Sequence, residues 1–598
     1  MGRIFERLRL TPGPIFAIEL LTAARRARYF VIRALYAILL LAILAFIYAE
    51  TFRWQEVSIQ SIATFSASFF NTFAVLQLLA VVLVGPAMAA GTIAMERERR
   101  TIEYLFATPL NNAEIVLGKL SARVLQIIYL LLAGVPVLAG AMLLGGIPPQ
   151  ALLVLLVITL STVASVAAVS VAISVWSVRA RDAVVRTYLV LFVLLALPPM
   201  LYWMPGLWTI VTWILAPLIA ANPFVAFFEI LSWSGVKTVS PWEVLWLLIR
   251  NQSLAAVLAV TAGTLAVRRV HLKQLGAAPR RRWRLRWQLF RPHIGTGPMM
   301  WKEIFAEPAS SRLGWIGYGA LGIILLALAW ATVYNYMEGI RMASGRMGKD
   351  YAMYAVIMGT VVSCGGLLLL AARSACSITS EKERHCWDSL LATPLTPREI
   401  INAKVGGNLW ALRGVLAILA LLWLPALTLL PEFLIAIPFL LGTLMILAVF
   451  ASALGVSISL RAKNSLRAMA LTLTIGVICG GVYLFCCMPM MIGWGGSGAE
   501  IMLTPCIPFL LAFPGVVAVE GFPSSRHEMG VTPAYVIGVI AYFIAACVLH
   551  LWAIDRFDDA AGRTRYDFFR PPRPRPLVKP AAQTPIVAEL VAEPVEEP

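Results

Sequence analysis

The chain has 598 residues, of which 60% are hydrophobic and only 13% charged, and its mean hydropathy is +0.82. So few charged residues cannot cover a soluble protein of this length, and apolar runs of about 20 residues, enough to cross a bilayer, recur throughout. The composition therefore excludes a soluble protein. It predicts an all-α polytopic membrane protein with about twelve transmembrane helices.

The first segment, residues 1–28, is rich in Arg and only patchily apolar. We expect it to form an amphipathic helix that lies on the inner face of the membrane.

Residues 29–270 are predicted to form a first unit of six transmembrane helices. These helices are expected near residues 30–49, 67–93, 121–145, 151–177, 184–203 and 246–267. The apolar stretch 206–228 is interrupted by Pro, so we expect a re-entrant or interfacial segment there. Glu229 follows it and is a candidate for lining a transport pathway or binding a cation; the alternative is contact with water at the outer interface.

Residues 271–296 are predicted to form a basic cytoplasmic linker. Its sequence "RRRWRLRWQLFR" (280–291) interleaves Arg with Trp, a pattern that can bind nucleic acid through phosphate contacts and base stacking. Because the segment lies between two predicted membrane units, we interpret it as a contact with membrane lipids and expect no nucleic-acid partner.

Residues 297–556 are predicted to form a second six-helix unit. Its helices are expected near residues 314–336, 352–376, 405–430, 433–459, 468–492 and 532–553. The stretch 503–519 corresponds to 206–228, and Glu520 after it is the second pathway candidate. Residues 557–598 are rich in Pro and end in acidic residues, so we expect a disordered cytoplasmic tail.

All eight Cys residues lie in the second half of the chain. Cys486 and Cys487 are adjacent, as in some soft-metal sites, but no second Cys or His pair stands at ligand spacing, so no metal site is predicted. A disulfide between Cys487 and Cys506 stays open at this point.

The net charge of +18 sets the orientation. With the N-terminus inside, most of the 49 Lys and Arg residues fall in the segments on the cytoplasmic side. This bias follows the positive-inside rule and predicts a multi-pass protein of the cell (inner or plasma) membrane with both termini in the cytoplasm.

A polar block occurs twice. Residues 96–119 read "ERERRTIEYLFATPLNNAEIVLGK" and residues 381–404 read "EKERHCWDSLLATPLTPREIINAK", with eleven of the 24 aligned positions identical. Further pairs keep the same order, among them "GPIFAIE" (13–19) with "GPMMWKE" (297–303) and "SVRARDA" (177–183) with "SLRAKNS" (459–465). Two units of six helices face the same way, so the chain is predicted to be a parallel repeat with a pathway between its halves.

Within each block the Thr-Pro pair predicts a break between two helices, at Thr108 and Thr393. The next helix should begin with a capping box, formed by Asn111 with Glu114 and by Thr396 with Glu399. Before each break, apolar residues at helical spacing predict a small apolar face, which we interpret as a docking surface for a partner rather than a helix on the bilayer. Its residues are Ile102, Leu105 and Phe106 in one copy and Trp387, Leu390 and Leu391 in the other.

The block after a second span, together with "GPMMWKE", resembles the permease subunits of ABC-2-type transporters. The resemblance implies that the loop after span 2 carries a coupling helix that inserts into a cytoplasmic P-loop ATPase, here through Glu96–Leu105 and Glu381–Leu390. The family usually has one six-span unit per chain, so two fused units imply a complete membrane pair with two ATPase copies. The expected ATPase-coupling residues are Glu96, Glu98, Arg99, Ile102, Glu103, Leu105, Thr108, Pro109, Glu114, Lys119, Glu381, Glu383, Arg384, Trp387, Asp388, Leu390, Thr393, Pro394, Glu399 and Lys404.

The sequence contains no G-x-x-x-x-G-K-[ST] phosphate loop. We therefore expect no cofactor in this chain, no catalytic residue, and ATP-Mg on the partner ATPase. The predicted function is the permease component of an ATP-driven exporter of unknown substrate. A secondary transporter is an alternative, although the spans carry few charged relay residues. An integral membrane enzyme is less favoured because no clustered catalytic motif is present.

Overall fold

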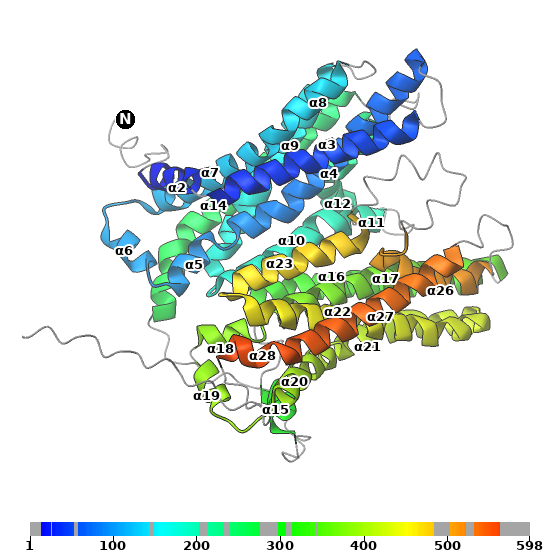
Figure 1. The fold of residues 1–598 in the computed structure, drawn as a ribbon. Coiled ribbons are helices and arrows are strands. Elements are labelled where there is room, and N and C mark those ends of the chain that lie inside the picture. Colours follow the sequence, from blue (N-terminus) through cyan, green and yellow to red (C-terminus); the bar gives the residue numbers. More distant parts are fainter. Residues whose placement is uncertain are drawn as a thin grey trace, which may run out of the picture.

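Helices make up the fold, and no strand occurs among the residues that the computed structural model describes (Figure 1). A helix satisfies its backbone hydrogen bonds internally, as the hydrocarbon core of a membrane requires. The described residues are 14–25, 27–52, 58–143, 149–202, 212–231, 240–275, 297–306, 314–341, 345–384, 386–482, 503–521 and 531–562.

The first half of the chain runs from α2 to α14. Its helices are α2 (Pro14–Ala24), α3 (Ala27–Thr51), α4 (Ile59–Ala89), α5 (Thr92–Glu98), α6 (Ile102–Ala107), α7 (Asn112–Leu131), η1 (Leu132–Gly134), α8 (Val135–Met142), α9 (Pro149–Trp176), α10 (Ala180–Leu191), η2 (Phe192–Ala196), α11 (Leu197–Tyr202), α12 (Thr212–Ala220), α13 (Pro223–Leu231) and α14 (Pro241–Leu275).

The second half runs from α15 to α28. Its helices are α15 (Pro298–Trp301), η3 (Lys302–Ala306), α16 (Gly314–Arg341), α17 (Gly345–Ala375), α18 (Thr379–Glu383), α19 (Trp387–Leu391), α20 (Pro397–Trp410), α21 (Arg413–Leu429), η5 (Pro431–Ile435), α22 (Ala436–Arg461), α23 (Ser465–Val477), η6 (Ile478–Val482), α26 (Ile507–Glu520), α27 (Val531–Asp555) and α28 (Phe557–Ala561).

Nine helices in the described part of the chain are long and apolar enough to cross a membrane, and they coincide with nine of the predicted spans. The prediction of an all-α polytopic membrane protein is confirmed. The three other predicted spans fall on α3, on α10 to α11, and on α23 with η6. In the first of the last two, the helix passes through a five-residue π-helical stretch, η2, and in the second α23 leads into another, η6, where the described residues end; the sequence predicted neither.

The Pro-interrupted stretches form short helices. α12 and α13 have 9 residues each and α26 has 14, fewer than the roughly 20 needed to cross the hydrocarbon core. Much of the linker, the Gly-rich loop 493–500 and most of the predicted tail lie outside the described residues. Cys506 is buried at the N-cap of α26, and Cys487 lies outside the described residues, so the disulfide between them stays a prediction.

Each half packs around its own fourth long helix. α9 packs against α4 and α14, and α22 packs against α17 and α27. Small residues on these central helices let neighbouring backbones approach closely, which favours helix packing in membranes. At Gly455 of α22, an added Cβ would lie 2.1 Å from Ser374 Oγ of α17.

The two halves meet along α10, α16 and α23, which lie side by side in Figure 1. A cluster of small and medium apolar residues fills this seam at one end of the bundle. Its buried members are Ala90, Ala94, Ala183 and Val184 from the first half and Ala372, Ala375, Cys376, Ala468 and Met469 from the second.

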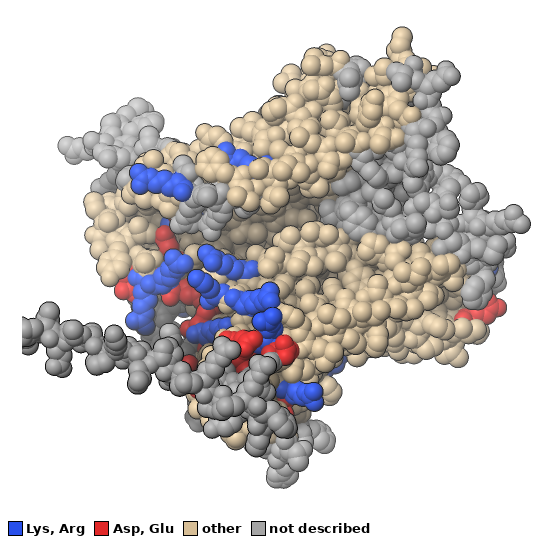
Figure 2. Space-filling model, in the orientation of Figure 1, with Lys and Arg blue, Asp and Glu red and all other residues tan. Residues whose placement is uncertain are grey.

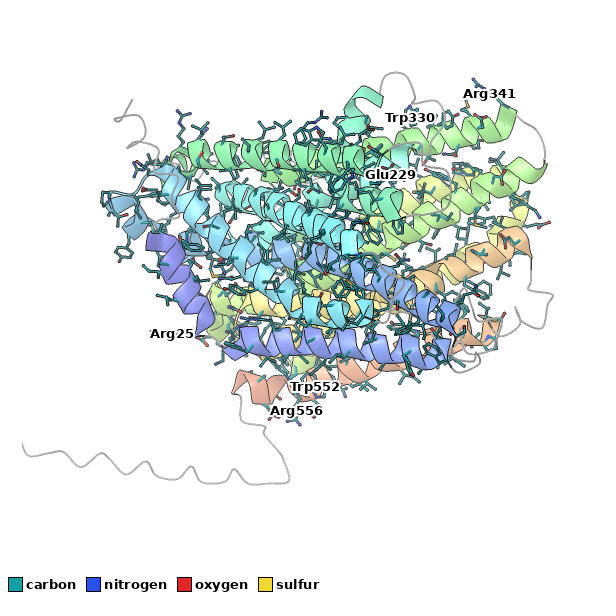
Figure 3. The ribbon with its side chains drawn as sticks, turned by 90° about the horizontal axis from the view of Figure 1, so that it is seen from above. Arg25, Glu229, Trp330, Arg341, Trp552 and Arg556 are labelled. Carbon is teal, nitrogen blue, oxygen red and sulfur yellow. The ribbon has the colours of Figure 1, made fainter. Side chains whose placement is uncertain are left out.

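The two ends of the bundle differ in charge. In Figure 2 most of the basic and acidic side chains gather at the end that holds α5 and α18, while the long helical walls are largely uncharged. Figure 3 places Arg25 and Arg556 towards this end and Arg341 at the opposite one.

Candidate functional site

The two copies of the polar block form two bent elements at the same end of the bundle (Figure 1). The first elbow comprises α5 and α6, and the second comprises α18 and α19. Arg100, between α5 and α6, has a positive φ of 59°, a conformation that turns the chain sharply in a single residue.

Each elbow ends at the predicted break, and the next helix begins with the predicted cap. Thr108 is extended with ψ at 157°, after which α7 begins with Asn111 as its N-cap. In the second copy Thr396 Oγ1 accepts a hydrogen bond from the Glu399 backbone N–H, and Glu399 Oε2 accepts one from the Thr396 N–H at 2.8 Å. Both capping boxes are confirmed.

One serine in each half joins its elbow to the central helix. Ser174 Oγ of α9 accepts hydrogen bonds from the backbone N–H groups of Ile93 and Ala94, at 3.2 and 3.0 Å. Ser459 Oγ of α22 accepts the equivalent bonds from Ile378 and Thr379, at 3.1 and 3.0 Å. Each serine thus satisfies two N–H groups that the first turn of a helix leaves without partners.

Substituting Ser459 with Ala should lower the free energy of unfolding by about 1–3 kcal/mol, because both backbone N–H groups would stay buried without an acceptor. Ser457 on the same helix is the matched control, since its hydroxyl donates to carbonyl oxygens and no N–H depends on it. Ser457→Ala should cost less than about 1 kcal/mol. Reversible unfolding in mixed micelles measures both, and equal costs would contradict this role of Ser459.

A basic side chain next to each serine contact ties the elbow to the same helix end. Arg97 Nη1 donates to the carbonyl oxygens of Val175 and Ser177, at 2.8 and 3.0 Å. Lys382 Nζ donates to Leu460 O at 2.7 Å. A cation at a helix C-terminus also complements the helix dipole, so both contacts hold the elbow against the ends of α9 and α22.

The acidic residue that follows this basic side chain in each copy contacts the helix after the central one, which is α10 in the first half and α23 in the second. Glu98 Oε2 accepts from Ala180 N at 3.3 Å. Glu383 Oε1 and Oε2 accept from Ser465 N and Ser465 Oγ, each at 2.7 Å. Both carboxylates therefore cap the N-terminus of a helix that lies at the seam between the halves.

These contacts also correct the alignment of the repeats. The sequence pairs "SVRARDA" with "SLRAKNS", which matches Ser177 with Ser459 at an offset of 282. In the structure Ser459 is equivalent to Ser174, and the N-cap Asn464 of α23 is equivalent to the N-cap Arg179 of α10, both at an offset of 285. The three-residue error arose because the similar letters were matched without regard to the helix ends they occupy.

A buried ion cluster holds the start of each half. In the second half Lys404 Nζ lies 2.7 Å from both Glu303 Oε1 and Glu381 Oε1. In the first half Lys119 pairs with Glu96 and, at 3.4 Å, with Glu19. Glu19 and Glu303 were not among the predicted site residues, although each closes one of the two matched "GP…E" segments.

The ion clusters change the interpretation of four predicted coupling residues. Lys119 and Lys404 are each 2% exposed, Glu381 is 7% exposed, and Glu96 is bonded to Lys119. Charged side chains that are buried and paired inside the chain are not available to a partner protein. We therefore assign them to the internal framework that supports the elbows.

The apolar face of each elbow is covered by the chain's own helices. Ile102 is buried, and the ring of Phe106 lies 5.2 Å from His271 at the end of α14. Leu390 is buried, and the ring of Trp387 lies 5.7 Å from Phe557 at the start of α28. A partner would therefore meet the opposite face, which the sequence alone did not indicate.

The outward face of each elbow is polar and exposed. Tyr104 is 76% exposed, and Glu103 and Asp388 occupy equivalent exposed positions on α6 and α19. The predicted residues that remain on exposed surface are Glu98, Arg99, Glu103, Thr108, Pro109, Glu383, Arg384, Asp388, Pro394 and Glu399, while Leu105, Glu114 and Thr393 are partly covered.

The two pathway candidates lie apart from the elbows. Glu229 is near the end of α13, away from the elbow end in Figure 3, and Glu520 ends α26; both side chains are exposed. Their role in a pathway stays a prediction. In the part of the chain that the structure describes, no group of three or more His, Cys, Asp or Glu residues could hold a metal ion.

Comparison with known proteins gives one match. Residues 14–267 match the family model described as "ABC-2 family transporter protein", a region that runs from α2 almost to the end of α14 and includes the first elbow. No curated protein and no solved structure is similar enough to count as a match.

Proposed function

We propose, from the match of residues 14–267 to the ABC-2 family of transporter proteins, that the whole chain is the membrane-spanning permease of an ATP-driven transporter, working as an exporter. Residues 297–556 would form a second unit of the same kind. The chain itself would bind no nucleotide, because its sequence lacks a phosphate loop. ATP and Mg²⁺ would bind to a separate cytoplasmic ATPase.

The observation that carries the proposal is the pair of equivalent elbows at one end of the bundle. Each presents an exposed polar face, and each is hydrogen-bonded on its inner side to two helices of its own half. These are α9 and α10 for the first elbow and α22 and α23 for the second. Such an element can take force from a partner and pass it into the membrane. Two copies favour two ATPase subunits, one on each elbow.

The distribution of charge supports a cytoplasmic position for the elbows. Most basic side chains gather at the elbow end (Figure 2), as the positive-inside rule requires of the cytoplasmic face. We infer that both termini are cytoplasmic and that the chain resides in the cell membrane. The largely uncharged helical walls suit an apolar or amphipathic substrate taken from the inner leaflet, which favours export.

Charge reversal on the exposed face of both elbows tests the proposal. In the double variant Glu103→Lys with Asp388→Lys, we expect recovery of the ATPase with the permease from gently solubilised membranes to fall at least about tenfold, because like charges would face the partner. The partner is identified by its phosphate-loop peptides and by labelling with azido-ATP.

Asp559→Lys is the matched control. Asp559 lies on α28, is 57% exposed and pairs with nearby Arg556 at 3.5 Å. Its reversal should leave ATPase recovery unchanged. Recovery that is equal for the double variant and the wild type, or the absence of any stoichiometric ATPase, would contradict the proposed function.

A further inference from the structure

A buried arginine at the seam between the halves has no hydrogen-bond partner. Arg181, in the first turn of α10, is 6% exposed, and none of its three guanidinium nitrogens makes a hydrogen bond. Among the described residues, its one ionic contact is with the neighbouring residue, where Asp182 Oδ1 lies 3.4 Å from Nε. Both terminal nitrogens, which form the fork that binds planar anions, are left without a partner.

The surroundings of Arg181 are positively charged. Asp182 also interacts with Arg179 and with Arg186, so one carboxylate faces three guanidinium groups. Glu98, the other acidic residue close to Arg179, accepts the backbone N–H of Ala180. Burial lowers the pKa of Arg179 below its usual range, and the nearby charges of Arg181 and of Arg384 from the second elbow lower it further.

Arg181 lies on the face of α10 that packs in the seam between the halves. Val184 lies three residues further along α10, on the same face, and packs in the cluster with Ala375, Cys376 and Met469 of the second half. Figure 2 shows basic side chains where the two halves meet at the elbow end.

The fold does not require these arginines. At the offset of 285, the positions of Arg179, Arg181 and Arg186 are occupied in the second half by Asn464, Leu466 and Leu471. The acidic cap is common to both corners, since Glu383 caps α23 as Glu98 caps α10, and Arg467 stands where the first half has Asp182. A buried charge without a partner is costly, and here a leucine serves equally well for the fold.

We propose that Arg181, with Arg179 beside it, binds a phosphate-bearing anion at the inner end of the seam between the two halves. Two guanidinium groups suit the oxygens of a phosphate, to which Arg donates two parallel hydrogen bonds. The phosphate belongs either to the headgroup of an anionic lipid of the inner leaflet or to a soluble phosphate compound. The site is asymmetric, because only the first half contains it.

Binding to the full chain in neutral detergent tests the site, with native mass spectrometry as the readout. Phosphatidylglycerol should bind the wild type at least about tenfold more tightly than phosphatidylcholine does, and Arg181→Leu should remove that difference. Arg467→Leu is the matched control, because Arg467 is an exposed arginine at the equivalent corner of the second half. It should bind phosphatidylglycerol as the wild type does.

A second arm separates the two sources of the phosphate. Inorganic phosphate and glycerol phosphate are titrated while the melting temperature is followed. A rise for the wild type and none for Arg181→Leu identifies a soluble ligand, whereas selective binding of phosphatidylglycerol alone identifies a lipid. Either result supports the site.

Three results would overturn the proposal: no selective binding in either arm, equal binding by Arg181→Leu and the wild type, or an equal loss in Arg467→Leu. Folding is controlled separately. Without ligand, Arg181→Leu should melt no lower than the wild type, as Leu466 at the equivalent position predicts. Arg181→Lys keeps the charge but not the fork, and should bind more weakly than the wild type and more tightly than Arg181→Leu.

Discussion

Replacing Lys404 with Met is expected to lower the free energy of unfolding by about 3–5 kcal/mol, because it leaves two buried carboxylates without their shared cation. Lys404 is 2% exposed, and its partners Glu303 and Glu381 are 8% and 7% exposed. Lys302, at 3.1 Å from Glu381, would remain as a partner for one of them only. Reversible unfolding in mixed micelles measures the loss.

Lys119→Met provides the comparison within the same chain. Its partners Glu19 and Glu96 are 23% and 25% exposed, so water can solvate them when the lysine is lost, and Arg123 still pairs with Glu19 at 2.9 Å. The cost should therefore be clearly smaller than for Lys404. Equal costs would mean that water also reaches the carboxylates of the second cluster.

A triple variant separates the loss of charge pairing from the loss of the lysine side chain. With Lys404→Met, Glu303→Gln and Glu381→Gln together, none of the three buried charges is left and Lys302 stays partly exposed to water, so stability should return to within about 1 kcal/mol of the wild type. Continued instability of the triple variant would instead show that the shape of the lysine, rather than its charge, holds η3 and α18 to α20.

Local sequence signals predicted the helices and their ends well. The apolar runs, the Thr-Pro breaks and the capping boxes of Asn111 and Thr396 depend on neighbouring residues only, and the structure has them where they were expected. The π-helical stretches η2 and η6 were not predicted, because their apolar sequences look like continuous helix.

The direction in which the charges point could not be predicted in the same way. The charged sequences "ERER" and "EKER" are typical of a solvated surface. In the structure, four of their side chains bond inward to helices further along the chain, namely those of Glu96, Arg97, Glu381 and Lys382. The repeat was the one available signal of these buried ion pairs, because Glu19 and Lys119 have the counterparts Glu303 and Lys404 in the second half. A buried charge kept in both copies needs a partner that is also kept in both.

The residues that cover the apolar face of the elbows could not be predicted, for a related reason. Helical spacing shows that Ile102 and Leu390 share a face with their neighbours, but spacing does not show what covers that face. The covering residues are His271, in the last turns of α14, and Phe557, just after the end of α27, and both are far along the chain from the elbows. Both lie beyond the range of any local pattern.

The double variant Glu98→Ala with Glu383→Ala should keep the ATPase bound but uncouple it from the membrane helices. The two carboxylates link the elbows to α10 and α23, which meet at the seam. Each bond from a charged acceptor to a helix N-terminus is worth about 1.5 kcal/mol at a partly solvated site. Losing both carboxylates would reduce the population in which the elbows stay linked to α10 and α23 by about a hundredfold.

Spin labels at the end of the bundle opposite the elbows report that conformation. Ile59→Cys at the start of α4 and Lys349→Cys near the start of α17 are exposed positions in the two halves. The exposed Cys386 and Cys547 would first be replaced by Ser. In the wild type, ATP should change the distance between the labels; in the double variant the change should disappear while ATPase recovery stays normal.

The single variants should not be equal. Glu383 accepts two hydrogen bonds of 2.7 Å from Ser465, whereas Glu98 accepts one of 3.3 Å from Ala180. Glu383→Ala should therefore abolish most of the distance change alone, and Glu98→Ala only a small part. If either variant instead releases the ATPase, the carboxylate that was removed contacts the partner directly in the wild type. Force must then reach α10 and α23 by another route.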